Sequence, residues 1–387
     1  MDLHPSTHPP LPPTTEDARL AWLRLLRSRR IGISSFYRLM AEHGSAEAAL
    51  DHLPEIARAA GVEKYSPCPM SVAEQELARG HRNGAHLLFV GGPGYPKQLL
   101  DLNDPPPMLW VLGRPELLNA QMIAVVGARA ASSLGLRMAK ALARDLGDAG
   151  YVVVSGLARG VDAEAHEAAL RSGTVAVQAG GVDTIYPKEN ADLSARIARN
   201  GLRISEQPMG FAPAARHFPA RNRLVAGLSR AVVVIEAAGR SGSLITARTA
   251  LDQGRDVMAV PGHPFDPRAA GCNMLIRDGA VLVRNASDVI EALGPEQYSL
   301  PEPRPPARRA PQPAPQKPAE VPPEAALERS LALHAQILEK LGPYPLQEDE
   351  LIRNVAVPAS TLTPVLTDLE LEGRIERQPG GFIAVVP

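Results

Sequence analysis

The chain has 387 residues, with 41 Lys or Arg against 42 Asp or Glu, so its net charge is −1 at neutral pH. This balance excludes a uniformly basic, histone-like protein, and the length predicts two or three domains. The charge is unevenly distributed: residues 120–290 carry 20 basic and 15 acidic groups, whereas residues 324–387 carry 5 and 10. The central region is therefore +5 and the C-terminal region −5.

The first 16 residues are rich in proline and lack the apolar core of a secretion signal, and no stretch of the chain approaches eighteen apolar residues. The two cysteines, Cys68 and Cys272, are too far apart in sequence for a zinc-ligand pair or a disulfide framework. We therefore expect a disordered head, no membrane span, no bound metal and a reducing, cytoplasmic location.

Residues 17–80 are expected to form short helices joined by tight turns. Their apolar residues recur at three- and four-residue spacing and are interrupted near Gly32 and Gly44. The pattern resembles a helix-hairpin-helix or sterile-alpha-motif-like bundle, in which the backbone amides of a turn can bind a DNA phosphate. A packing or dimerisation module is an equally open interpretation.

Residues 84–294 predict an α/β fold, an extended Rossmann-like parallel sheet. Continuous apolar runs, typical of strands buried on both faces, occur at 123–126, 152–154, 175–177, 232–235 and 257–260. The segments between them have helical periodicity. Because ligands of open α/β sheets bind at the carboxyl ends of the strands, the loops after these runs are the candidate site.

The first three of these loops combine glycines with arginine or serine. Gly127 and Arg129 follow the first run, and Ser132 is placed to begin the next helix; Arg159 lies in the second loop and Gly181 in the third. An arginine beside a helix N-terminus suits a phosphodiester oxygen. Glycines at strand ends also serve commonly as turns alone, so each loop by itself is a weak signal.

The most informative segment is 206–229, where basic residues surround an aromatic ring. Its candidate site residues are Arg216, Phe218, Arg221, Asn222 and Arg223. Cations can pair with the phosphates of a single strand while the ring stacks on an unpaired base, which a duplex does not offer. The alternative is that Phe218 packs in the core and the arginines form structural ion pairs.

The fifth loop presents Ser241, Gly242 and Ser243 at the start of a helix, where small residues and hydroxyls can bind an anion. It lacks the Gly-Lys-Ser/Thr ending of a Walker A loop, so nucleotide hydrolysis is not predicted. No metal-ligand spacing or nucleophile motif occurs elsewhere in the sequence, and the chain is expected to be a binding protein and not an enzyme.

The C-terminal part begins with a predicted linker, residues 295–323, because residues 301–323 hold ten prolines. Residues 324–387 then predict a winged-helix module of three helices and a two-stranded wing. Such modules often bind duplex DNA through the third helix. Here that helix carries Asp368, Glu370 and Glu372 and no Lys or Arg. This favours a protein-contact or regulatory role, with DNA binding through the arginines of the wing as the alternative.

Seven motifs, taken in order, resemble those of the DprA/Smf family of DNA-processing proteins. They are VGARAAS, SGLARGVDAEAH, GGVDTIYPKEN, SEQPMG, FPARNRLVAGLS, EAAGRSGSLITARTALDQGRDVMAVPG and GCNMLIRDGA, within about residues 85–290. The resemblance implies a protein without cofactor or known enzymatic activity that binds and protects incoming single-stranded DNA during natural transformation. It also implies dimerisation through the Rossmann domain and loading of the RecA recombinase; single-strand-binding protein is a further candidate partner.

Matched motif by motif, the DNA pocket of that family would fall on Arg129, Phe218, residues 221–223 and residues 241–243. Arg216 is nearest to a lysine that some relatives carry upstream of the phenylalanine. The competing interpretation is a Rossmann-type nucleotide-binding or phosphoribohydrolase-like enzyme, with Glu236 at a strand end as its acid. Such enzymes have a P-G-G-x-G-T loop, which residues 239–243 replace here with Gly-Arg-Ser-Gly-Ser.

Overall fold

The computed structural model describes residues 11–294 and a discontinuous set of residues between 336 and 385. It divides into two units: the larger holds residues 11–50 and 68–294, and the smaller holds residues 51–67 and the described residues beyond 336. Residues 1–10 of the predicted head and the whole predicted linker, 295–323, lie outside the described residues.

Between residue 11 and the sheet, the structure describes four helices: α1 (Glu16–Arg27), α2 (Ile33–His43), α3 (Ala46–Ala59), which has residues in both units, and α4 (Met70–Arg82). The Thr15 side chain caps α1 by accepting from the Ala18 amide at 3.2 Å. Gly44 ends α2 with a φ of +77°, a left-handed conformation that favours glycine. Trp22 of α1 packs edge-on against Phe36 of α2, with ring centroids 5.1 Å apart.

The larger unit is built on a nine-stranded sheet in the order β1-β2-β6-β5-β4-β3-β7-β8-β9. The strands are β1 (His86–Phe89), β2 (Met108–Gly113), β3 (Met122–Gly127), β4 (Val152–Ser155), β5 (Thr174–Val177), β6 (Leu202–Ser205), β7 (Ala231–Ile235), β8 (Asp256–Ala259) and β9 (Val281–Leu282). All neighbours from β6 to β9 pair in parallel, whereas β2 and β1 extend the sheet antiparallel. The predicted α/β class with a mostly parallel sheet is confirmed.

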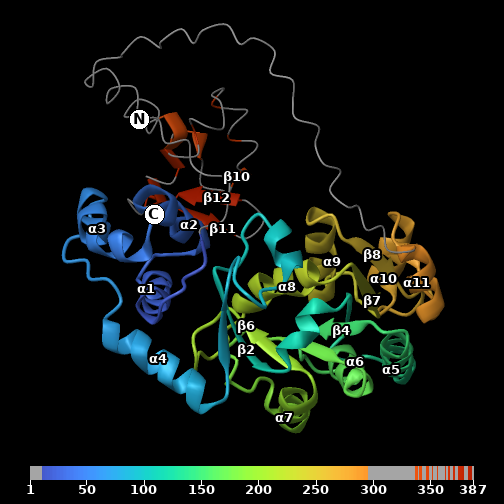
Figure 1. Ribbon diagram of the computed structural model, residues 1–387. Coiled ribbons are helices and arrows are strands. Elements are labelled where there is room, and N and C mark those ends of the chain that lie inside the picture. The colour runs from blue at the N-terminus through green and yellow to red at the C-terminus, as the bar shows by residue number, and fades with distance from the viewer. Residues whose placement is uncertain are drawn as a thin grey trace, which may run out of the picture. The chain divides into compact units, whose positions relative to one another are not determined.

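Helices cover both faces of this sheet (Figure 1). They are α5 (Ser133–Asp148), α6 (Val161–Ala169), α7 (Ala191–Asn200), α8 (His217–Leu228), α9 (Gly242–Asp252), α10 (Ala270–Arg277) and α11 (Ala286–Leu293). One core packs α5, α6 and α11 on β3, β4 and β7, with Leu142, Ala165 and Val289 fully or almost fully buried. Helices α8 and α9 cover the opposite face. Because the strands from β6 to β9 are parallel, the loops that follow them lie at one common edge.

Beyond residue 336, three short antiparallel strands form a sheet in the order β10-β12-β11. They are β10 (Leu346–Gln347), β11 (Ile375–Gln378) and β12 (Phe382–Val385). Ile375 and Ile383 pack with buried helical residues such as Leu362 and Leu366, so a small sheet lies on helices as in a winged helix. Asp368 and Glu372, which carried the charge argument, lie outside the described residues.

Two further observations bear on the expectations from composition. Both cysteines are free and buried. Among the residues that the structure describes, no helix combines the length and the apolar character needed to cross a bilayer.

Candidate nucleic-acid interface

A pocket of about 540 Å³ opens where the loops after β3, β4 and β5 meet the first turn of α8. Its charged lining comprises Arg129, Arg159, Lys188 and Glu189, and its aromatic lining comprises Tyr186 and Phe218. The carboxyl ends of neighbouring parallel strands bring these loops together although they are up to about ninety residues apart in sequence. The pocket therefore combines net positive charge with two aromatic rings.

The two rings adjoin each other and present a surface for stacking. The centroids of Tyr186 and Phe218 lie 5.4 Å apart with the ring planes tilted by 46°. The guanidinium carbon of Arg129 lies 5.5 Å from the centroid of the Phe218 ring. Tyr186 is 47% exposed, so its ring is only partly covered by protein. A cation beside partly exposed aromatic rings is the combination that binds an unpaired base and its phosphate.

The cations of the pocket are available to a ligand. Arg129 and Lys188 are exposed, and neither forms an ion pair with the described residues. Arg159 lies 3.6 Å from Glu189, and both side chains are more than 60% exposed. Solvent screens such an exposed pair strongly, so a phosphate can take the place of the carboxylate at little cost.

The backbone amides of the loop after β4 donate hydrogen bonds to side chains of α6. One carboxylate oxygen of Asp162 accepts from the amides of Gly156 at 3.0 Å and Ala158 at 3.3 Å. The ring of His166 accepts from the amide of Leu157 at 3.3 Å, and Leu157 has a φ of +55°. Because these amides already have acceptors, a phosphate at this loop depends on side-chain cations.

The hydrogen bonds of His166 fix its tautomer. The Thr174 hydroxyl donates to the carbonyl of Val153 at 2.8 Å, so it must accept from Nδ1 of His166, 2.7 Å away. Nε2 then carries no proton and accepts from Leu157. Burial, with a smaller contribution from the cation of Arg221, lowers the pKa of His166 to about 3. The imidazole is therefore a neutral structural group.

The lowered pKa of His166 predicts that the free energy of unfolding depends on pH. In the unfolded chain His166 protonates near the ordinary histidine pKa of 6.5, whereas in the folded chain it resists protonation down to about 3. Its contribution is thus complete above pH 6.5 and is lost as the pH falls, by up to about 1.4 kcal/mol per unit. Urea unfolding at pH 7, 6 and 5 should show a slope that His166→Gln, which keeps one donor and one acceptor, reduces by about one proton. Equal slopes in both proteins would contradict the assignment.

Two arginines that were expected to contact phosphates point into the protein. Arg221 is 6% exposed and donates to the carbonyls of Gly156, at 2.6 Å, and Val177. Burial lowers its pKa to about 10, although the Asp162 carboxylate opposes this shift. The guanidinium thus ties the ends of β4 and β5 to α8. For Arg221 the geometry favours the structural alternative.

Arg223 has the same character. It pairs with Glu206 and, at 3.3 Å, with Asp104, and its side chain is 12% exposed. Burial raises the pKa of Glu206, and the cation of Arg223 opposes that shift. Asn222 accepts from Nε of Arg221 at 3.2 Å. Because α8 packs on the sheet, this part of the helix faces protein. Arg216, by contrast, is exposed at the N-cap of α8.

The turn after β3 holds a carboxylate where dinucleotide-binding folds hold a pyrophosphate. Glu236 accepts from the Ser132 amide at 2.7 Å and from the Ser132 hydroxyl, at the N-terminus of α5. A Cβ on Gly135 would lie 2.5 Å from the Glu236 carboxyl carbon. The anion site of this helix is therefore filled by the protein itself.

The remaining predicted site residues are two glycines and the turn formed by residues 241–243. A Cβ at Gly127 would lie 1.8 Å from the Ile235 carbonyl oxygen, and one at Gly181 would lie 2.4 Å from that of Pro208, so both glycines allow close packing. Ser241 is the N-cap of α9, and its hydroxyl lies 2.7 Å from that of Ser243, next to the exposed Gly242. None of these five residues lines the pocket.

Of the predicted site residues, the pocket brings together Arg129, Arg159 and Phe218. It adds Tyr186 and Lys188, which were not among the predicted site residues. The available signal was the Tyr-Pro-Lys run in the third strand-end loop: an aromatic and a cation two residues apart at the edge where ligands collect.

Comparison with known proteins identifies the family of this chain. The chain matches three family models: DNA recombination-mediator protein A over residues 86–294, the DprA-like N-terminal HHH domain over 16–78 and the DprA winged helix domain over 305–381. Protein Smf of Escherichia coli K12 is 36% identical over 325 residues, 83% of each chain. DNA processing protein DprA of Streptococcus pneumoniae is 45% identical over 198 residues, 51% of this chain and 70% of that protein.

Two solved structures are also similar. DprA from Streptococcus pneumoniae has a TM-score of 0.55 at 35% identity and covers 67% of this chain and 97% of its own. DNA processing protein A from Helicobacter pylori, described for its single-stranded DNA binding mode, has a TM-score of 0.50 at 34% identity and covers 54% and 95%. The main family model alone spans more than half of the sequence. The chain therefore belongs to the DNA recombination-mediator protein A family, that is, to the DprA/Smf proteins.

Proposed function

We propose that the pocket is a binding site for single-stranded DNA. An unpaired base stacks on the rings of Tyr186 and Phe218, and the neighbouring phosphates pair with Arg129, Arg159 and Lys188. The observation that carries this proposal is the meeting of two aromatic rings and three cations in one pocket. The similar Helicobacter pylori protein, described as binding single-stranded DNA, supports it.

The same geometry disfavours duplex DNA at this site. Stacking needs an unpaired base whose face is free, and in a duplex both faces are covered by neighbouring bases. The pocket carries no element that enters a groove: the protein contributes loops and the first turn of α8. Binding should therefore favour single strands and depend weakly on sequence.

The proposed pairing of Arg129 with a phosphate predicts how DNA binding depends on salt. Changing Arg129 to alanine removes one phosphate contact, so the plot of log affinity against log salt should become shallower by about 0.7 units, and binding to all sequences should weaken. Fluorescence anisotropy with a labelled oligonucleotide at several salt concentrations measures both quantities. The control is Arg199→Ala, an exposed arginine in the last turn of α7, at the opposite edge of the sheet. An unchanged slope for Arg129→Ala would remove this residue from the site.

The action of the bound complex belongs to the same proposal. We infer that the protein protects incoming single strands and loads RecA onto them in the cytoplasm, as a dimer joined through its Rossmann-like domain and without chemical turnover. Membership of the family supports this role. Loading is tested by following RecA assembly on DNA precoated with single-strand-binding protein. Assembly should be faster with this protein and should stay slow with its Phe218→Ala variant.

The alternative of a nucleotide-processing enzyme requires a free acid at Glu236 and an open phosphate site at α5. Both are occupied, because the carboxylate is engaged by the amide and the hydroxyl of Ser132. Titration with a mononucleotide separates the two functions. A mononucleotide that binds as tightly as an oligonucleotide would favour the enzyme or a nucleotide sensor.

A further inference from the structure

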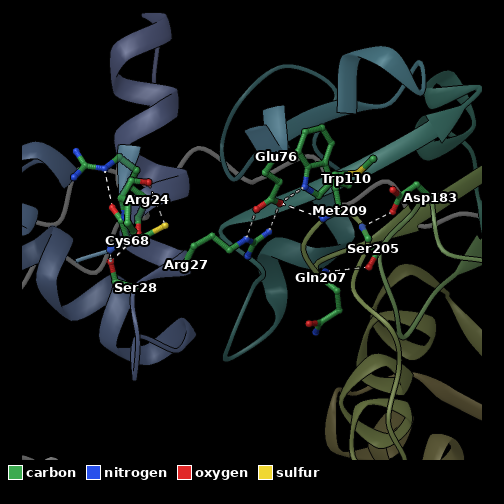
Figure 2. A network of polar contacts seen from close by, with 12 residues as sticks. Arg24, Arg27, Ser28, Cys68, Glu76, Trp110, Asp183, Ser205, Gln207 and Met209 are labelled. Atoms are coloured by element: carbon green, nitrogen blue, oxygen red, sulfur yellow. Dashed lines mark hydrogen bonds and ion pairs between the residues drawn. The ribbon is translucent and has the colours of Figure 1, made fainter. Parts of the chain in front are cut away.

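Helix α4 carries two charged side chains one turn apart that contact the segment after β6. The first is Glu76, which is 9% exposed. Its carboxylate accepts two hydrogen bonds of 2.9 Å from Arg27 of α1, one of 2.9 Å from the Trp110 indole and one of 3.4 Å from the Met209 amide (Figure 2). A buried carboxylate with this many donors fixes α4 against the sheet and against α1.

The second side chain is Arg79, whose Nε donates to Asp183 at 2.5 Å. The Asp183 side chain is 4% exposed, and its other oxygen accepts from the Gly210 amide at 2.6 Å. A Cβ on Gly210 would lie 2.4 Å from Nη1 of Arg79, so the guanidinium lies directly on this glycine. Met209 and Gly210 are adjacent in sequence. Helix α4 therefore contacts this segment through both Glu76 and Arg79.

Asp183 stands at the start of the segment that forms one wall of the DNA pocket. The segment is anchored at its base: the Gly181 amide donates to Phe211 at 2.9 Å, and the Gln178 side chain donates to the Thr184 carbonyl at 2.8 Å. Residues 184–189 line the pocket and include Tyr186 and Lys188. A change at Asp183 is thus three residues from the stacking ring.

From these contacts we propose that Arg79 is a positioning residue for single-stranded DNA. Through Asp183 it holds the loop that presents Tyr186 and Lys188, without touching DNA itself. The proposal rests on the proposed function of the pocket. A loop that is already ordered loses less conformational entropy on binding, so the free protein binds more tightly. The ion pair between Arg27 and Glu76 joins α4 to α1. Helix α1 is therefore connected to the pocket loop through α4.

The test compares Arg79→Met with Arg82→Met, which removes a charge from the same helix at an exposed position without an ion pair to the described residues. In the full chain, Arg79→Met should weaken binding of a labelled oligonucleotide roughly three- to tenfold. The salt slope should stay unchanged, because no phosphate contact is lost. Amide exchange of residues 184–190 should become faster, and Arg79→Lys should recover part of the affinity.

A double-mutant cycle shows whether Arg79 acts through Asp183. In the Asp183→Asn background, Arg79→Met should have little further effect on affinity. Fully additive losses would overturn the proposal, as would unchanged affinity in Arg79→Met or a salt slope lowered by about 0.7 units, which would make Arg79 a phosphate contact. If the unsubstituted protein binds no single-stranded DNA, the proposed function fails, and the positioning role fails with it. Arg79→Lys covers the case in which Arg79→Met does not fold.

Discussion

Replacing Arg221 with methionine should lower the free energy of unfolding by about 3–5 kcal/mol, because it takes the cation from a buried charged network. The carboxylate of Asp162 would remain in a place where burial already raises its pKa, without the cation of Arg221 that opposes this shift. The carbonyls of Gly156 and Val177 would also lose their donor. A buried acceptor without a partner costs about 1–3 kcal/mol, which is part of the expected loss.

Urea unfolding at neutral pH measures this loss. The double variant Arg221→Met with Asp162→Asn should regain part of it, since the amide carries no charge to be left alone. The loss of stability in the single variant should also be smaller at low pH. Burial raises the pKa of Asp162, so the folded chain takes up a proton there when the pH is lowered to that pKa. The carboxyl group is then neutral, and no unpaired buried charge remains. A variant that keeps full stability but shows a shallower salt dependence of DNA binding would restore Arg221 to the phosphate contacts.

The difference between Arg221 and Arg129 shows what sequence reasoning can reach at this site. The cluster of basic residues around Phe218 was visible in the sequence, but the direction of each side chain depends on how α8 packs. The acceptors of Arg221 are distant in sequence, with Gly156 sixty-five residues away. Residue type and local spacing cannot reveal such a partner, so a buried arginine and an exposed one looked alike.

The strands follow a similar rule. β3, β4, β5, β7 and β8 were predicted because each is a continuous apolar run buried on both faces. β6 was not, because Arg203 interrupts its apolar pattern. In the fold Arg203 is only 5% exposed and donates to the side chain of Gln178 at 2.9 Å and to the Val182 carbonyl. Its charge is accommodated by partners on the β5 side that no local pattern discloses. The edge strand β9 has two residues, both exposed, and gives no signal.

The motif SEQPMG was recognisable as part of the family pattern, yet its role becomes clear only from contacts. Ser205 donates to the Gly180 carbonyl at 2.6 Å, Glu206 pairs with Arg223, and the Met209 amide donates to Glu76. The motif therefore contributes structural contacts and does not line the pocket. The sequence thus located the edge at which the site lies, whereas the division into ligand contacts and supports required the packed fold.

The largest loss of DNA binding is expected when the stacking surface is removed. Alanine at Phe218 should weaken binding of single strands roughly 5- to 150-fold, because base stacking on an aromatic ring contributes about 1–3 kcal/mol per base. Tyr186→Ala should act in the same direction. Neither change removes a cation, so the salt slope should remain that of the unsubstituted protein, opposite to the pattern for Arg129→Ala.

Two controls separate stacking from general damage to the loop. Phe211→Ala removes a ring that packs edge-on against His217, with centroids 4.8 Å apart, and lies outside the pocket lining. Phe218→Leu keeps an apolar side chain of similar volume but no aromatic face, so it should stay close to the alanine variant in affinity. If leucine restored full binding, Phe218 would be a packing residue. Stacking also predicts that binding of duplex DNA changes less than binding of single strands in both pocket variants, since a paired base has no free face to lose.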